Sequence, residues 1–194
     1  MKSQRERKKE DIILHRIEAY IRLALIFIAI ISVLYLPILL YLKKKGKSII
    51  RQLSYIGLIS SVFLIIFATI LFVPINFHPE EYILNIKPFN GIVNMESFQQ
   101  TMIEKISNIM LFVPLGLFIP IVLRNKRKLY KTTMIALGIS FSVEFIQYFI
   151  GRSSDIDDII TNVLGAIIGY GLFKIVNKFL HEKKWWNKLI GNNE

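Results

Sequence analysis

The sequence contains no cysteine and only three histidines, so any chemistry it performs comes from other residue types. Without cysteine the chain has no disulfide, no thiolate metal site and no cysteine nucleophile. The histidines, His15, His78 and His181, lie in three different segments, and no Ser/His/Asp arrangement accompanies them. Acidic residues are also few, at 14 against 25 Lys and Arg. These shortages exclude thiol chemistry and give no support to histidine-based catalysis.

Apolar sequence is abundant: 53% of the 194 residues are hydrophobic and the mean hydropathy is +0.47. Five runs approach or reach the roughly 20 residues that a helix needs to cross a bilayer, at 21–42, 53–73, 106–123, 132–150 and 159–180. The first run is too long for a signal-peptide core, and no small-residue cleavage site follows it, so we expect it to be retained. We therefore predict an all-α, polytopic integral membrane protein with about five transmembrane helices.

The formal net charge of +11 comes from short basic blocks between the apolar runs. This pattern is typical of cytoplasmic loops that touch anionic lipids, and not of a nucleic-acid-binding surface. Residues 43–51, residues 124–131 and the C-terminal segment from Lys174 onward each carry five Lys or Arg, whereas loops 74–104 and 151–158 are net acidic. Five spans then place the basic segments and the C-terminus in the cytoplasm and both acidic loops outside. The N-terminal tail conflicts with this topology, because its seven Lys or Arg through Arg22 would lie outside.

The chain divides into four parts along its length. Residues 1–20 form a basic segment with helical character, and residues 21–84 hold two anchoring spans and the start of the outer loop. Residues 85–180 hold the last three spans, and residues 181–194 form a basic tail whose Trp185 and Trp186 suit an interfacial anchor. In the second half of loop 74–104, apolar residues recur at helical spacing, which predicts an interfacial helix leading into the third span.

Small residues and one proline indicate how the last three spans pack. Pro114 lies inside the third span together with Gly116. Because proline has no N–H, the carbonyl of Met110 loses its helical partner, and we expect the helix to bend there. On the fifth span, Gly165 and Gly169 form a small-xxx-small pattern that lets two helices approach closely. The sequence thus predicts a bent third span packed on the fourth and fifth.

Polar residues interrupt these three spans at one predicted depth. Ser140, Glu144 and Gln147 share one helical stripe, and Asp158 and Asn162 share another. Ionisable side chains in or beside lipid are costly by a few kcal/mol each and mark a functional site by default. The candidate site residues are Asn108, Glu144, Gln147, Arg152, Asp155, Asp157, Asp158 and Asn162.

Two interpretations of this polar set stay open. In the structural one, the amides hydrogen-bond across helices for about 0.6–2 kcal/mol, and Asp155, Asp157 and Asp158 cap the fifth span. In the functional one, the residues form a pocket that opens outward and holds a charged headgroup or sugar. Glu144 is central to that pocket because a membrane-embedded glutamate needs a partner or a proton, and Arg152 is the expected cation. The carboxylates also allow Mg²⁺ or Ca²⁺, although D-x-D-D spacing alone is a weak metal signal.

Four motifs follow one another over residues 85–175 in a specific order and spacing. They are NIKPFN at 85–90, N-I-M-L-F-V-P-L-G at 108–116, S-x-x-x-E-x-x-Q from Ser140 to Gln147, and R-x-x-D-x-D-D-x-x-x-N-x-x-G-x-x-x-G-Y from Arg152 to Tyr170. Together they resemble the VanZ-like family, and only Lys87 departs from the apolar residue usual before the proline. The namesake of this family is associated with low-level resistance to the glycopeptide teicoplanin. The resemblance implies a multi-pass protein of the bacterial plasma membrane with a role in the envelope.

The resemblance and the polar set lead to three hypotheses of function. The first is a role in the cell envelope or in teicoplanin resistance, through binding or remodelling an envelope precursor or a lipoglycopeptide. The second is a membrane enzyme on a lipid-linked phosphate or sugar, with carboxylates as acid/base groups or metal ligands. The third is a structural partner of another membrane protein, in which the glycines matter and the carboxylates do not.

Overall fold

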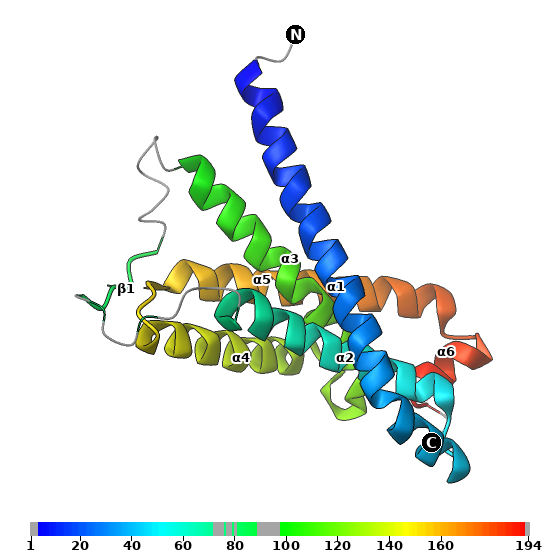
Figure 1. Cartoon of the computed structure of the whole chain (residues 1–194). Coiled ribbons are helices and arrows are strands. Elements are labelled where there is room, and N and C mark those ends of the chain that lie inside the picture. Colours follow the sequence, from blue (N-terminus) through cyan, green and yellow to red (C-terminus); the bar gives the residue numbers. More distant parts are fainter. Residues whose placement is uncertain (1–3, 72–75, 77–78, 80, 89–97, 193–194) are drawn as a thin grey trace.

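The computed structural model describes residues 4–71, 76, 79, 81–88 and 98–192, which are almost entirely helical (Figure 1). The helices are α1 (Gln4–Lys44), α2 (Ile49–Ile66), α3 (Phe98–Val122), α4 (Leu129–Phe149), α5 (Ile156–Leu180) and the short α6 (Lys184–Leu189). A π-helical turn, η1 (Phe67–Leu71), extends α2, and a 3-10 turn, η3 (Arg124–Lys126), follows α3. The strands β1 (Leu84–Asn85) and β2 (Ser154–Asp155) have two residues each and pair in parallel.

The prediction of an all-α protein with five membrane-length helices is confirmed. The segments long and apolar enough to cross a membrane are Leu25–Lys44, Ile49–Leu71, Thr101–Val122, Leu129–Phe149 and Ile156–Leu180. Residues 4–20 and the first span form one continuous helix, and the helix predicted before the third span is the start of α3 itself. The first residues of that predicted helix, 95–97, lie outside the described part of the chain.

Helix α3 lies at the centre of the bundle and carries most of its core. Phe112, Leu115 and Ile119 are almost completely buried, and they pack with apolar side chains of α2, α4 and α5 in one cluster. The helix contains Pro114 and Pro120 and stays helical through both. In Figure 1, α4 and α5 run side by side while α3 crosses α5. The position of α3 therefore sets how the other spans meet.

The most extensive helix contact joins α3 to α5, and glycines lie along it. A methyl group placed on Gly116 would overlap the backbone carbonyl of Ala166. One placed on Gly169 would overlap the carbonyl of Val113, and Gly165 meets the α3 backbone in the same way. Any side chain at these three positions would push the two helices apart.

Different elements form the two ends of the bundle. At one end, which we call the loop end, η1, β1, β2, the part of α3 around Lys105, the end of α4 and the start of α5 meet, and Figure 1 shows β1 beside the end of α4 and the start of α5. At the other, the basic end, the α1–α2 turn, η3 and α6 meet. The described lysines and arginines of the three basic segments lie toward this second end, and the candidate site lies at the first.

A buried arginine, Arg51 of α2, joins α3 and α6 at the basic end. The Arg51 guanidinium donates from Nη1 to the carbonyls of Ile121 and Leu189, each at 2.9 Å. Its Nη2 donates to the carbonyl of Val122 at 2.6 Å. The last carbonyls of a helix have no partner within it, so Arg51 satisfies the end of α3 and ties it to α6. The sequence suggested a loop position for Arg51, but α2 begins two residues before it and buries it.

Candidate functional site

The candidate site begins where α4 ends. Gly151 has φ +76°, a left-handed conformation that glycine adopts at little cost and that commonly terminates helices. The carbonyl of Ile150 accepts a hydrogen bond from the N–H of Asn76 at 3.0 Å. A Cβ atom at Gly151 would overlap the carbonyl of Asn76. Asn76 is thus packed directly against the end of α4.

A short parallel sheet covers this end of α4. Leu84 and Asn85 pair with Ser154 and Asp155, and the N–H of Ser154 donates to the carbonyl of Ile83 at 3.0 Å. Sequence reasoning did not find this sheet, because strands of two residues are too short to produce an alternating pattern. The pairing holds residues 83–85 of loop 74–104 beside the start of α5.

Asp155 joins three parts of the site. Its N–H donates to Oε2 of Glu144 at 2.9 Å, and its Oδ1 accepts from the N–H of Asp157 at 2.8 Å, which caps α5. Its Oδ2 lies 3.3 Å from Nζ of Lys105. The same ammonium donates to Oδ1 of Asp158 at 2.6 Å. Lys105, on α3, is therefore the cation that holds two of the predicted aspartates.

Lys105 is the residue of the candidate site that sequence reasoning missed. Its side chain is largely buried, with a residue exposure of 9%. The loop was predicted to end at residue 104 and the third span to start at residue 106, so Lys105 fell between the two and was not included among the candidate residues. Its position one helical turn before Asn108, on the same face, is the signal that could have identified it. Asn108 itself is half-buried, and within the described chain no hydrogen bond joins it to the other candidate residues.

The side chains of Gln147 and Arg152 donate hydrogen bonds to η1, at the end of α2, and not to Glu144. Nε2 of Gln147 and Nη1 of Arg152 donate to the same carbonyl, that of Thr69, at 3.1 and 3.0 Å. Thr69 lies in η1, the last helical turn of this segment, where backbone carbonyls lack partners within the helix. Arg152 was expected to be the cation of Glu144, but among the described residues no ion pair joins these two side chains.

A second polar pair lies deeper between α4 and α5. Nδ2 of Asn162 donates to Oγ of Ser140 at 2.9 Å, and both residues are buried. Ser140 precedes Glu144 by one turn, and Asn162 follows Asp158 by one turn. The two antiparallel helices are therefore joined by polar contacts at two successive levels.

Replacing Ser140 with alanine is expected to lower the free energy of unfolding by about 1 kcal/mol, because the buried Asn162 amide loses its acceptor. Unfolding of the purified protein in mixed detergent micelles measures the change. Ser142→Ala is the matched control, since Ser142 is exposed and its hydroxyl bonds only the carbonyl of Gly138 in its own helix. Equal stability of the Ser140→Ala variant and wild type would contradict this hydrogen bond.

Glu144 also lines a cavity of about 460 Å³ between β1, α4 and the start of α5. Apart from Glu144, Asn85 and Ser154, its described walls are apolar or aromatic. One wall is a row of aromatic side chains on α4, namely Phe141, Phe145, Tyr148 and Phe149. A volume of this size suits a small molecule or part of a larger one. The cavity thus offers one buried carboxylate within a largely apolar surface.

Lys105 is the cation that accompanies the carboxylates of Asp155 and Asp158. Lys105 lies within 3.3 Å of both Asp155 and Asp158. Among the described residues, no three His, Asp or Glu side chains lie together in an arrangement that could hold a metal ion. Glu144, Asp155, Asp158 and Lys105 can form hydrogen bonds and charge pairs.

This architecture, five apolar helices with α3 at the centre and a polar cluster joining three of them, is that of a multi-pass helical membrane protein. The chain belongs to the VanZ/LLP1 family, whose family model matches residues 27–177. It is similar to Protein VanZ of Enterococcus faecium, with 29% identity over 140 residues that cover 72% of this chain and 82% of that protein. No solved structure matches the chain. The resemblance expected from the motifs is confirmed, and the match begins earlier, within α1.

Proposed function

We propose that this protein acts in the cell envelope, in resistance to lipoglycopeptides such as teicoplanin, by binding an amphiphilic envelope component or the lipoglycopeptide itself. Membership of the VanZ/LLP1 family supports a resistance-related membrane protein. The observation that carries the finer proposal is the cavity at the loop end, in which Glu144 lies within apolar and aromatic walls.

We infer that the loop end faces outward and the basic end faces the cytoplasm of a bacterial plasma membrane. The three concordant basic segments support this orientation, since Lys and Arg are enriched in cytoplasmic loops. Loops 74–104 and 151–158, both net acidic, then lie outside. In this orientation the cavity is open to envelope components and to compounds that arrive from outside the cell.

The walls of the cavity suit a ligand with both apolar and polar parts. Phe145 and Phe149 lie with ring centroids 4.9 Å apart and are each more than half exposed, so they present a broad aromatic surface. Aromatic and aliphatic surface contributes affinity through burial of apolar area. A carboxylate accepts hydrogen bonds from hydroxyl, amide or ammonium groups, and such charge-assisted bonds are the strong ones. Glu144 would therefore fix the orientation of a bound amphiphile.

Replacing Glu144 with glutamine is expected to remove most of the protection against teicoplanin in a susceptible host that expresses the protein. Glutamine keeps the size of the side chain but loses the negative charge, and a hydrogen bond to a charged group is worth about 1.5–3 kcal/mol, or roughly tenfold or more in affinity. The readouts are the inhibitory concentration of teicoplanin and the amount of labelled teicoplanin that the cells bind.

Glu182→Gln provides the control, because Glu182 is an exposed acid at the opposite end of the bundle. This variant is expected to protect as well as the wild type. Immunoblots of the membrane fraction show whether all variants reach equal levels. Full protection by Glu144→Gln at an equal level would refute the proposed site.

A further inference from the structure

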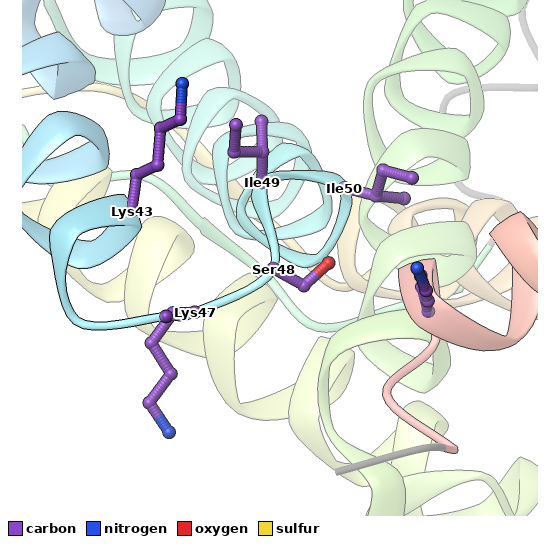
Figure 2. Close-up of a pocket in the computed structure, with 7 residues that line it drawn as sticks. Lys43, Lys47, Ser48, Ile49 and Ile50 are labelled. Carbon is purple, nitrogen blue, oxygen red and sulfur yellow. The ribbon is translucent and has the colours of Figure 1, made fainter.

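A second cavity, of about 690 Å³, lies at the basic end and takes no part in the proposed function. It is bounded by the end of α1, the α1–α2 turn, the first residues of α2 and one residue of α6. Three of its seven lining residues are lysines, Lys43, Lys47 and Lys188, and none of the described lining residues is acidic. In Figure 2, Lys43 and Lys47 extend in opposite directions from the α1–α2 turn, and Ser48 lies beside them at the start of α2. Segments far apart in the sequence thus surround one cavity with cationic groups.

The α6 wall of this cavity is held in place by its own contacts. The carbonyl of Leu189, the residue after Lys188, accepts a hydrogen bond from Arg51 at 2.9 Å. Trp186 is 3% exposed, and its Nε1 donates to Oδ1 of Asn177 at 2.9 Å. The backbone that carries Lys188 is therefore fixed against α2 and α5, so the cavity does not depend on a ligand for its shape.

Positive charge is concentrated around this cavity, and none of the described residues that line it is acidic. Helix α2 begins at the N-cap Ser48 and has no acidic residue in its first turn, so the partial positive charge of its N-terminus adds to that of the lysines. Burial, and repulsion by Arg124 and Arg51, lower the pKa of Arg127 below its ordinary value. An anion bound at this end would relieve that repulsion.

We propose that this cavity binds a phosphate group, carried by the headgroup of an anionic membrane lipid. Ammonium groups and helix N-termini are common partners of phosphate oxygens in proteins. Ile49 and Ile50 line the same cavity, and Ile49 is 39% exposed, which provides an apolar edge for the start of an acyl chain. Trp185 on α6 is 48% exposed, and tryptophan is enriched at the level of lipid headgroups. These apolar neighbours favour a lipid over a free phosphate.

Titration of the purified full-length protein in neutral detergent tests the site. Short-chain phosphatidylglycerol, short-chain phosphatidylcholine and inorganic phosphate are added separately, and the midpoint of thermal unfolding is followed. The decisive variant is the triple substitution Lys43→Gln, Lys47→Gln and Lys188→Gln. The matched control is Lys44→Gln, Lys128→Gln and Lys184→Gln, three exposed lysines of the same end that do not line the cavity. Each variant is compared with its own ligand-free midpoint, so a loss of intrinsic stability does not imitate a loss of binding.

Phosphatidylglycerol is expected to raise the midpoint of the wild type and of the control triple. In the cavity triple its affinity is expected to fall roughly a hundredfold, because three charges that each attract an anionic lipid are lost. A shift of the midpoint by phosphatidylglycerol alone supports the lipid headgroup as ligand. An equal shift by inorganic phosphate supports a phosphate site but overturns the proposal that a lipid carries the phosphate. Equal affinities of the two triples, or a shift no larger than that with phosphatidylcholine, would overturn the site. The single variant Lys188→Gln, expected to bind roughly five- to tenfold more weakly, repeats the test if the triple does not fold.

Discussion

Gly169→Ala is expected to destabilise the protein by about 1–3 kcal/mol, whereas Gly171→Ala, two residues further along α5, is expected to be neutral or stabilising. A methyl group on Gly169 would overlap the carbonyl of Val113 and approach the N–H of Leu117, so α3 and α5 would have to separate. Nothing lies within 4 Å of the corresponding position at Gly171. There alanine only gains helix propensity, worth up to about 1 kcal/mol. The two substitutions are identical in chemistry and differ only in what the new methyl group meets.

Unfolding of the purified variants by increasing fractions of a denaturing detergent gives the two free energies side by side. Because α3 also carries the central core residues, separation of α3 from α5 is expected to loosen the whole bundle. A loss of teicoplanin protection by Gly169→Ala would then follow from a lower level of folded protein in the membrane. Similar stability of the two alanine variants would show that α3 and α5 do not approach as closely as the carbonyl contacts require.

The features that sequence reasoning predicted are those with a local signal. A membrane span is visible as a long apolar run, and the glycine pattern of α5 is visible as a spacing of four residues. The cap of α5 is also local, because Asp155 precedes a helix whose first turn contains Asp157 and Asp158. Each of these can be identified without knowing what lies opposite in the folded chain.

The partners of the site residues could not be predicted in this way. The cation beside Asp155 and Asp158 comes from 50 and 53 positions earlier in the chain, and the acceptor for Arg152 is a backbone carbonyl, which every residue possesses. Helical spacing shows which residues share a face, but not which face of which helix lies opposite. The nearest arginine in the sequence was therefore assigned to Glu144, while the structure places it on Thr69.

Asp155 takes part in both the structural and the functional interpretation of the polar set. Its side chain caps α5 and pairs with Lys105, while its backbone N–H holds the Glu144 carboxylate in place. Stabilising α5 and orienting Glu144 are thus one arrangement and not two alternatives. For that reason, substitutions at Asp155 would mix both effects, and Lys105 is the better residue for testing the ion cluster.

Replacing Lys105 with methionine is expected to lower the free energy of unfolding by about 3 kcal/mol. The change removes the ammonium that lies 2.6 Å from Asp158 and 3.3 Å from Asp155, and it leaves two carboxylates facing each other without their cation. Removing one partner of a largely buried ion pair is more damaging than removing both, because the remaining charge stays desolvated. The double variant Lys105→Met with Asp158→Asn is therefore expected to be more stable than Lys105→Met alone.

A double-mutant cycle of the two single variants and the double variant in detergent isolates this coupling. Lys174→Met, at an exposed lysine of α5, controls for the general loss of a positive charge and is expected to change stability by less than about 0.5 kcal/mol. If Lys105→Met were as stable as Lys174→Met, the ion cluster would not hold α3 to the start of α5. The expected coupling would instead show that Lys105 fixes Asp155. Because the N–H of Asp155 binds the Glu144 carboxylate, Lys105 would then also fix the orientation of Glu144 that the proposed binding site requires.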